Sequence, residues 1–274
     1  MKIFFSGFIV IVFCFNCYTQ KNDSISKVYT IYPWIDLPVI AVGAITNPIG
    51  LKYVRNKTPL DSSEVVNLGP DDVNWFDRCA TRQDMNFKPT AEEISDWGVN
   101  VSLILPAFLF LDREIRSEWL DVLVLYFESH MISANLYTYG AARFVDRARP
   151  LVYNSDFPME QRAGANTMNS FFSGHTSTSA ASSFFMAKVY CDFHPELGAK
   201  KFIFYSLALI PPVFTGYYRI KASRHFPTDV ITGIIVGGGM GILIPHIHKT
   251  KKNKNLAIMP YTGESHGVVL TYKF

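Results

Sequence analysis

The sequence predicts an all-α fold: a helical bundle of about five to six membrane-type helices, followed by a short β-like C-terminal tail. Its composition is the first observation, since 49% of the 274 residues are hydrophobic and 18% are charged. Soluble domains contain roughly 25% charged residues. The second observation is a series of apolar segments, each about long enough, or nearly so, to cross a hydrocarbon core of about 30 Å. These segments span residues 97–111, 119–139, 176–191, 202–217 and 228–247.

Residues 1–20 are predicted to be a signal peptide or an uncleaved membrane anchor, because Lys2 precedes a continuous apolar run. A second apolar stretch, at 34–53, carries Asp36, two prolines and two glycines. We therefore expect a helix that lies against the core or at the membrane interface rather than a span. The whole of residues 21–96 is interpreted as an N-terminal periplasmic region whose second half is polar and irregular.

Residues 97–250 are predicted to form the functional bundle. Small residues in the 176–191 segment, and the run Gly237-Gly238-Gly239, suit the close approach of helices in lipid. The alternation of β-branched residues that is typical of strands is missing, so helices are the expected element. The remaining residues, 251–274, hold a basic stretch and a tail that alternates like a strand pair.

The last apolar segment ends in a basic stretch at 248–254, which indicates a cytoplasmic end under the positive-inside rule. With five alternating crossings, and with residues 34–53 not crossing, the connections 140–175 and 217–229 face outward. The sequence thus predicts a protein of the bacterial inner membrane with these connections in the periplasm. A periplasmic protein with buried helices is the alternative.

The connection 217–229 brings three polar residues with catalytic potential close together. Pro227 suits the first turn of a helix, because its φ is fixed and its missing N–H would be unpaired there. Asp229 then lies in the same turn, where the helix dipole favours a carboxylate. From there it can orient His225, as the carboxylate of a triad does. Arg219 supplies a positive charge whose shape suits an oxyanion.

Two further polar clusters lie in the stretch 140–175. Arg149 is the last of three arginines that follow a predicted helix. Ser173, Gly174 and His175 open the next helix, where free backbone N–H groups can bind an anion. Arginines beside membrane helices are also common headgroup contacts, and Ser-Gly is a common helix cap. Neither cluster predicts a site by itself.

Taken in order, the three clusters resemble the signature of the type 2 phosphatidic acid phosphatase superfamily. Its patterns are K-x6-R-P, P-S-G-H and S-R-x5-H-x3-D, and it includes lipid phosphatases, soluble acid phosphatases and vanadium haloperoxidases. The resemblance covers about residues 97–247. The matching residues are Arg149-Pro150, Ser173-Gly174-His175, and Arg219 with His225 and Asp229.

The resemblance implies a phosphatase that acts on a phosphomonoester or diphosphate and needs no metal or other cofactor. It implies that His225 is the nucleophile that forms a phosphohistidine and that Asp229 orients it. It also implies that His175 protonates the leaving oxygen and later activates water, the double role of a general acid–base.

Phosphate binding is implied for four more residues. These are Arg149, Arg219, and Ser173 and Gly174 through their backbone N–H groups. They would stabilise charge on the equatorial oxygens, which matters because phosphoryl transfer depends mainly on positioning and electrostatics.

The chain departs from the family pattern at three positions. Ala142 stands where the lysine is expected, so one phosphate contact is missing. Arg143 or Arg147 could replace that contact, although neither is in register. Phe172 stands in place of proline and Tyr218 in place of serine, and neither of these losses removes an essential charge.

The interpretation we favour is a phosphatase of a membrane lipid phosphate, with the lipid and the membrane as its partners. The alternatives are a periplasmic non-specific acid phosphatase, a vanadate-dependent haloperoxidase, and a weakened or inactive member that binds lipid phosphate. Nucleic acid is not an expected partner, because the net charge is only +3 and there is no basic stripe. No Cys/His spacing resembles a zinc site. Lys221 and Arg224 match no motif position and are expected to contact headgroups.

Overall fold

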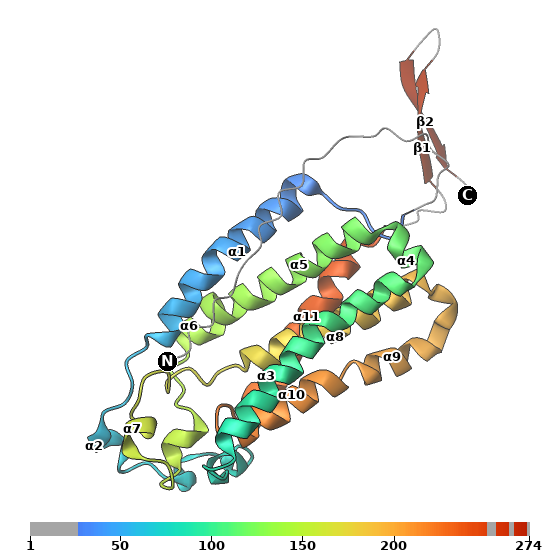
Figure 1. Ribbon diagram of the computed structural model, residues 1–274. Helices are drawn as coiled ribbons and strands as arrows, with labels where there is room; N and C mark the ends of the chain where they lie inside the picture. Colours follow the sequence, from blue (N-terminus) through green and yellow to red (C-terminus); the bar gives the residue numbers. More distant parts are fainter. Residues whose placement is uncertain (1–26, 251–255, 263–265, 273–274) are drawn as a thin grey trace.

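The computed structural model describes residues 27–250, 256–262 and 266–272. The predicted signal peptide or anchor at residues 1–20 lies outside the described residues. Long helices run side by side in one bundle, and an antiparallel strand pair follows them in the chain (Figure 1). The expected all-α fold with a short β-like tail is confirmed.

The bundle is built from the long helices α1 (Pro33–Arg55), α3 (Lys88–Ile104), α5 (Trp119–Asn135), α8 (Gly174–Phe193), α10 (Ile210–Lys221) and α11 (Pro227–His248). Shorter helical segments connect them: α2 (Ser62–Val65), η1 (Pro70–Asp72), η2 (Arg78–Arg82), η3 (Leu105–Leu111), α4 (Arg113–Ser117), η4 (Leu136–Ala141), α6 (Ala142–Phe144), η5 (Pro150–Tyr153), α7 (Met159–Arg162), η6 (Pro195–Lys200) and α9 (Lys201–Leu207). The strands are β1 (Leu256–Thr262) and β2 (His266–Tyr272).

The predicted apolar segments all coincide with helices of the bundle. The largest difference is α3, which begins at Lys88 rather than at residue 97 and continues through η3. Its first turns carry Glu92 and Asp96, which make them look like a polar connection in the sequence. Both residues line a polar cavity. The predicted boundary between residues 96 and 97 consequently falls inside a helix.

Residues 34–53 were expected not to cross the membrane, but they form a helix, α1, that is long and apolar enough to cross one. Among the described residues, the helical stretches long and apolar enough to cross a membrane are Pro33–Arg55, Lys88–Leu111, Pro195–Lys221 and Pro227–His248. The outward face of α1 exposes large apolar side chains such as Trp34 and Ile45, whereas Asp36 is buried. The polar residue in this stretch therefore lies on the inner side of a helix that has the dimensions of a span.

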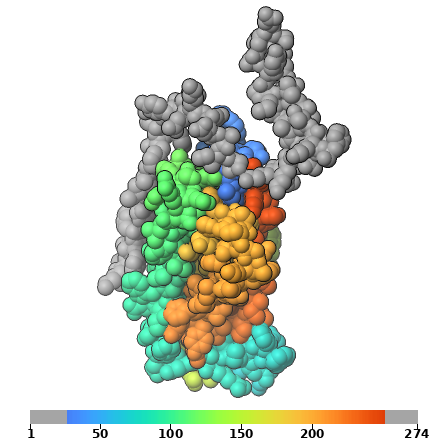
Figure 2. Space-filling view, turned by 90° about the vertical axis from the view of Figure 1, so that its right-hand side faces the viewer, coloured from blue at the N-terminus to red at the C-terminus, as the bar shows by residue number. Residues whose placement is uncertain are grey.

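The outer surface of the bundle is apolar. Figure 2 shows the face on which α9 and α10 lie, in gold and orange. The large apolar side chains exposed on these two helices include Phe202, Ile203, Leu207, Ile210, Val213 and Phe214. On the inner side, Leu125 of α5, Phe185 of α8 and Ile244 of α11 pack in one core cluster. A bundle that is apolar both inside and outside is typical of helices surrounded by lipid.

The long helices alternate in direction, so their connections gather at two ends of the bundle (Figure 1). Helices α1, α5 and α10 end, and α3, α8 and α11 begin, at the end that holds the polar cavity. At the other end the N–H of Thr30 donates to the carbonyl of His248, and the N–H of Thr250 donates to the carbonyl of Val28, both at 2.9 Å. The basic stretch after α11 therefore begins at the end opposite the cavity.

Helices α8 and α11 make the most extensive contact in the bundle. A Cβ atom on Gly237 would lie 1.9 Å from the main-chain oxygen of Ser177. Gly233 and Gly241, about one turn to either side, meet backbone oxygens of α8 at 2.7 and 2.5 Å in the same way. Small residues four apart are typical of closely packed membrane helices. The contact fixes the start of α8 against the start of α11, and both starts carry predicted site residues.

Replacing Gly237 with alanine should destabilise the protein, because the added methyl group meets backbone that cannot move aside without separating the two helices. We expect a loss of about 1–3 kcal/mol or more in the free energy of unfolding. Gly239→Ala is the matched control, since no heavy atom lies within 4 Å of the added Cβ. Thermal unfolding in detergent measures both variants, and an equal midpoint for the two would contradict the packing argument.

Candidate active site

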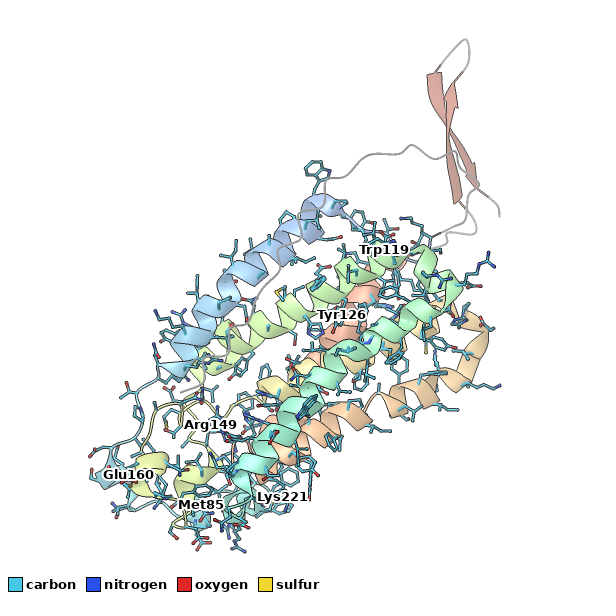
Figure 3. The ribbon with its side chains drawn as sticks, in the orientation of Figure 1. Met85, Trp119, Tyr126, Arg149, Glu160 and Lys221 are labelled. Carbon is cyan, nitrogen blue, oxygen red and sulfur yellow. The ribbon has the colours of Figure 1, made fainter. Side chains whose placement is uncertain are left out.

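A polar cavity of about 470 Å³ lies at the end of the bundle where α3, α8 and α11 begin. Arg149 lies at this end, opposite Trp119 (Figure 3). The predicted site residues that line the cavity are Arg149, Gly174, His175, Arg219 and His225. The structure therefore brings the three sequence clusters together around one space.

Arg149 is buried at the cavity wall without a carboxylate partner. It is 5% exposed, and no carboxylate among the described residues lies within ion-pair distance of it. Its Nε donates to Asn169 Oδ1 at 2.9 Å, and its Nη1 donates to the carbonyl of Arg224 at 3.4 Å. Burial, and then the nearby charges of Arg224 and Arg219, lower the pKa of Arg149 to about 9. The group stays cationic at neutral pH and has capacity left to bind an anion.

Arg219 is the second buried cation of the cavity. It is 7% exposed, and its Nη1 lies 3.8 Å from Asp96 Oδ1, a long separation for an ion pair. Nη1 also donates to Ser95 Oγ at 3.4 Å, while Nε has no partner among the described residues. A buried donor without a partner costs about 1–3 kcal/mol. An anion in the cavity would offset that cost.

Arg224 adds a third guanidinium group to the cavity wall. It was expected to contact lipid headgroups, but its Nε donates to Glu92 Oε1 at 2.5 Å. Glu92 also pairs with Lys88 at 3.1 Å. Arg224 thus has a close carboxylate, whereas Arg149 has none within ion-pair distance among the described residues and Arg219 has Asp96 at 3.8 Å.

His225 is held in one tautomer by the backbone. Its Nδ1 lies 2.7 Å from the carbonyl oxygen of Ser170, which can only accept a hydrogen bond. Nδ1 therefore carries the ring proton, and in the neutral ring Nε2 presents a lone pair. Burial, with the charges of Arg149 and Arg219, lowers the pKa of His225 well below its usual value. The ring is therefore neutral, and the lone pair of Nε2 is available.

Asp229 lies behind His225 but does not hydrogen-bond to it. Its Oδ2 is 3.9 Å from His225 Nδ1. The same oxygen accepts from Ser170 Oγ at 2.6 Å and from the N–H of Phe226 at 2.8 Å. Asp229 therefore does not orient the ring directly, as the sequence had led us to expect. Ser170 links the two residues instead: its carbonyl accepts from His225 Nδ1, and its hydroxyl donates to the Asp229 carboxylate.

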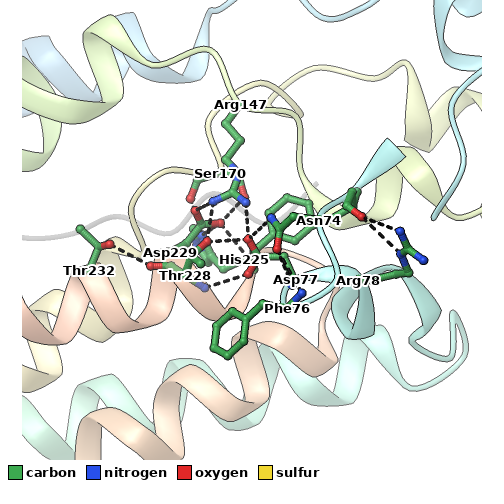
Figure 4. Close-up of polar contacts among 12 residues, drawn as sticks. Asn74, Phe76, Asp77, Arg78, Arg147, Ser170, His225, Thr228, Asp229 and Thr232 are labelled. Atoms are coloured by element: carbon green, nitrogen blue, oxygen red, sulfur yellow. Dashed lines mark hydrogen bonds and ion pairs between the residues drawn. The ribbon is translucent and has the colours of Figure 1, made fainter. Parts of the chain in front are cut away.

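A buried network joins Asp229 to the polar N-terminal stretch (Figure 4). Arg147 donates to Asp229 Oδ1 at 2.5 Å and to Asp77 Oδ2 at 2.7 Å. Thr228 donates to Asp77 through its N–H at 3.0 Å and its hydroxyl at 2.7 Å. Burial alone raises the pKa of Asp77, but hydrogen bonds from Asn74, Thr228 and Arg147 outweigh it and lower the pKa below its usual value. Asp77 is therefore an ionised part of the scaffold under the site.

His175 contacts a carboxylate that the sequence analysis did not select. Its Nε2 lies 3.0 Å from Asp96 Oδ1. Because a carboxylate only accepts, Nε2 carries a proton toward Asp96. Asp96 lies one helical turn after Glu92 on α3, and both face the cavity. An acidic pair at this spacing in the first turns of a helix is the sequence signal that could have identified them.

Phosphate binding through backbone N–H groups was predicted for both Ser173 and Gly174, but the structure gives the two residues different surroundings. The N–H of Ser173 donates to the carbonyl of Asp229 at 3.0 Å, and its hydroxyl caps α8 by accepting from the N–H of Thr176 at 3.4 Å. Ser173 is fully buried and does not line the cavity, whereas Gly174 does. Ser173 thus joins the starts of α8 and α11, and Gly174 is the residue of the pair that faces the cavity.

The missing motif lysine is not replaced by either expected arginine. Ala142 is fully buried. Arg143 lies over the ring of Tyr53 at 5.2 Å and lines a separate cavity, while Arg147 belongs to the network under the site. Arg55, near the end of α1, lines the polar cavity that also holds Arg149 and Arg219. It forms no ion pair or side-chain hydrogen bond within the described part of the chain. No motif pointed to this residue.

Comparisons with known proteins were made against families, curated proteins and solved structures. The sequence model of the PAP2 superfamily matches residues 123–253. No curated protein matches the chain. Among solved structures, the chain is similar to the "first transmembrane PAP2 type phosphatidylglycerolphosphate phosphatase from Bacillus subtilis" at 17% identity and a TM-score of 0.42. That match covers 78% of this chain and 96% of the other.

Replacing Asp77 with asparagine should destabilise the protein and misplace the loop that carries His225. Removing one partner of a buried ion pair costs about 3–5 kcal/mol, and we expect about 2–4 here because Arg147 is partly exposed. Asp71→Asn is the matched control: Asp71 pairs with Arg78 at 3.1 Å, but its side chain is 90% exposed. Unfolding midpoints and phosphate release test both variants, and equal effects of the two substitutions would refute a structural role for the network.

Proposed function

We propose that this chain is a membrane phosphatase of the PAP2 superfamily, whose sequence model matches residues 123–253, and that it hydrolyses a phosphomonoester or diphosphate of a lipid through a phosphohistidine. One observation carries the proposal. Arg149 has no carboxylate within ion-pair distance among the described residues, Arg219 pairs with Asp96 only at 3.8 Å, and both buried cations line the same cavity as His225. A phosphate group has the negative charge and the acceptor oxygens that these two guanidinium groups can bind.

The first chemical step is attack on phosphorus by His225. Its Nδ1–H bond to the Ser170 carbonyl leaves Nε2 free, and its lowered pKa keeps that nitrogen unprotonated. As the N–P bond forms and the bond to the leaving oxygen breaks, positive charge develops on the ring. The Ser170 carbonyl, and Asp229 behind it, stabilise that charge.

His175 is the group we assign to the leaving oxygen. It lines the cavity beside Gly174 and contacts Asp96 through Nε2. In its protonated form it can donate to the alcohol or phosphate that departs, and it can then take a proton from the water that attacks the phosphohistidine. Microscopic reversibility makes one residue suitable for both steps. Asp96 holds the ring in position for each.

The equatorial oxygens of the transferred group would be held by Arg149, Arg219 and backbone N–H groups at the start of α8. The first N–H groups of a helix have no intrahelical partner, and the helix dipole favours an anion there. In phosphoryl transfer such preorganised donors supply most of the stabilisation of the transition state. Arg55 supplies a further cation, and we assign to it the contact that the motif lysine would have made.

A lipid substrate is favoured by the way in which the cavity meets the bundle surface. Helix α1 packs against α5, whereas α3 packs against α8 and α10, and the cavity lies between these two groups. Leu51, Val54 and Val99 give its wall apolar surface beside the cations. A lipid phosphate could place its headgroup among the arginines and its chains between α1 and α3. Under the positive-inside rule, the basic stretch that follows α11 in the sequence supports a periplasmic location of this site.

Phosphate release from purified protein tests the substrate class. Undecaprenyl diphosphate, phosphatidylglycerol phosphate, phosphatidic acid and lipid A phosphate would be compared in mixed micelles with water-soluble phosphate esters. We expect a higher kcat/KM for at least one lipid than for every soluble ester. Equal values for soluble and lipid substrates would refute the lipid assignment and support a non-specific phosphatase.

Removal of the nucleophile should abolish turnover. His225→Ala is expected to lower kcat by at least about 10³-fold, because the covalent route is lost. His194→Ala is the control, since His194 is a partly exposed histidine that pairs with Asp112 and Glu196 away from the cavity. Rapid quenching of the wild type with radiolabelled substrate should also trap acid-labile phosphohistidine. Unchanged phosphate release by the His225→Ala variant would refute the mechanism.

Arg55 should contribute to substrate binding if it stands in for the missing lysine. We expect Arg55→Gln to lower kcat/KM by about 10-fold or more, the effect of losing one hydrogen bond to a charged group. Arg143→Gln is the matched control, because Arg143 lies at the same end of the bundle but lines a different cavity. If the two variants have the same kcat/KM, Arg55 has no role in phosphate binding.

A further inference from the structure

A second polar cluster lies inside the bundle, at the end opposite the phosphate cavity. Asp36 of α1, Glu128 of α5 and His248 of α11 are each buried, and one ligand atom from each lies within 4.8 Å of the others. His248 Nε2 is 3.3 Å from Asp36 Oδ1 and 3.8 Å from Glu128 Oε2. None of the three residues takes part in the proposed reaction.

The hydrogen bonds around this cluster direct three acceptor atoms toward one another. His248 Nδ1 lies 2.9 Å from the carbonyl of Ile244, so in the neutral ring it carries the proton and Nε2 presents its lone pair. Asp36 Oδ2 accepts from the N–H of Tyr32 at 2.7 Å, which leaves Oδ1 facing His248. Glu128 Oε2 is buried and has no hydrogen-bond partner among the described residues. With the His248 ring neutral, three acceptor atoms face one another without a donor between them, an arrangement that a bound cation would satisfy.

The cluster also carries unbalanced negative charge. Within the described part of the chain, no lysine or arginine forms an ion pair with Asp36 or Glu128. Lys249, which follows His248, pairs with Asp192 at 2.7 Å instead. Carboxylates buried in an apolar bundle are costly unless they are paired or bound to a metal. Ionisable residues inside membrane helices therefore indicate a binding function.

We propose that Asp36, Glu128 and His248 bind one divalent transition-metal ion of the Zn²⁺ class. In a tetrahedral site with bonds of about 2.0–2.1 Å, ligand atoms are separated by about 3.3 Å, close to the separations at His248. The set of one imidazole and two carboxylates suits Zn²⁺ better than Mg²⁺, which prefers an all-oxygen octahedron. The bond from His248 Nδ1 to a carbonyl is the usual support for a metal-bound imidazole.

The ion would join three helices. Asp36 lies in the first turn of α1 and His248 is the last residue of α11, so the ion would fix the start of one helix to the end of the other through Glu128 in the middle of α5. The ring of Tyr32, which is 54% exposed, lies 6.2 Å from the His248 ring. The site is therefore close to the surface of the described chain. Its role is to stabilise the bundle.

Metal binding can be measured directly on the full chain in detergent. Protein treated with a chelator would be incubated with Zn²⁺, desalted and analysed for bound metal, and its unfolding midpoint would be recorded with and without Zn²⁺. We expect one ion per chain and a higher midpoint, since a ligand that binds only the folded state stabilises it. Glu128→Gln and Asp36→Asn should weaken binding by at least about 10–100-fold, the loss caused even by changes to the outer partners of metal ligands.

His194→Gln is the matched control for this experiment. His194 also contacts two carboxylates, but Asp112 through Nε2 and Glu196 through Nδ1, so its partners do not converge on one lone pair. This variant should bind Zn²⁺ as the wild type does. Phosphate release should persist in all three variants, which shows that they fold and separates this proposal from the proposed function.

Two results would overturn the metal site. One is a wild-type chain that retains no Zn²⁺ and shows no change in midpoint. The other is equal Zn²⁺ retention by the wild type and by the Glu128→Gln and Asp36→Asn variants. If a variant does not fold, Co²⁺ added to the wild type decides the question. A four-coordinate site gives strong visible absorption, and its absence contradicts the assignment.

Discussion

Unbalanced positive charge at the end of the bundle is the constraint on which the rest of the site depends. Burying a guanidinium group without a close carboxylate costs free energy. Arg149 is buried in that state, and Arg219 pairs with Asp96 only at the long separation of 3.8 Å. Neutral partners such as Asn169 and main-chain carbonyls hold Arg149 in place but leave its charge uncompensated. Burial, together with the same charges, lowers the pKa of His225 well below its usual value. One electrostatic arrangement would thus serve both parts of the proposed function, phosphate binding and an unprotonated nucleophile.

Rigid backbone contacts maintain this arrangement. The glycines of α11 allow it to lie directly on α8, and the N–H of Ser173 donates to the carbonyl of Asp229 where the two helices begin. Arg147 forms ion pairs with both Asp77 and Asp229, and these contacts hold the Asp229 carboxylate in place. The residues that face the cavity are therefore positioned by contacts that do not themselves touch the substrate, as a preorganised site requires.

The helical bundle and the meeting of the three motifs at one end could be predicted from the sequence, because membrane helices that alternate in direction bring every second connection to the same end. It did not reveal Asp77, Asp96 or Arg55, whose positions depend on tertiary packing rather than on local pattern. The helix at 34–53 was underestimated for a physical reason. Its glycines and Asp36 are typical of an interrupted segment. However, Gly43 faces α5 and Gly50 faces η4 so closely that an added Cβ would lie 2.7 Å from Met131 and Thr138, respectively.

The network at Asp77 also sets an order of assembly. Asp77 bonds to Thr228 across a separation of 151 residues, and Arg147 lies between them in the chain. Closing a loop of this length costs conformational entropy, which the contacts must offset. Asp77 cannot gain these partners until Thr228 has been synthesised. The network under the cavity consequently depends on residues from both ends of the described bundle.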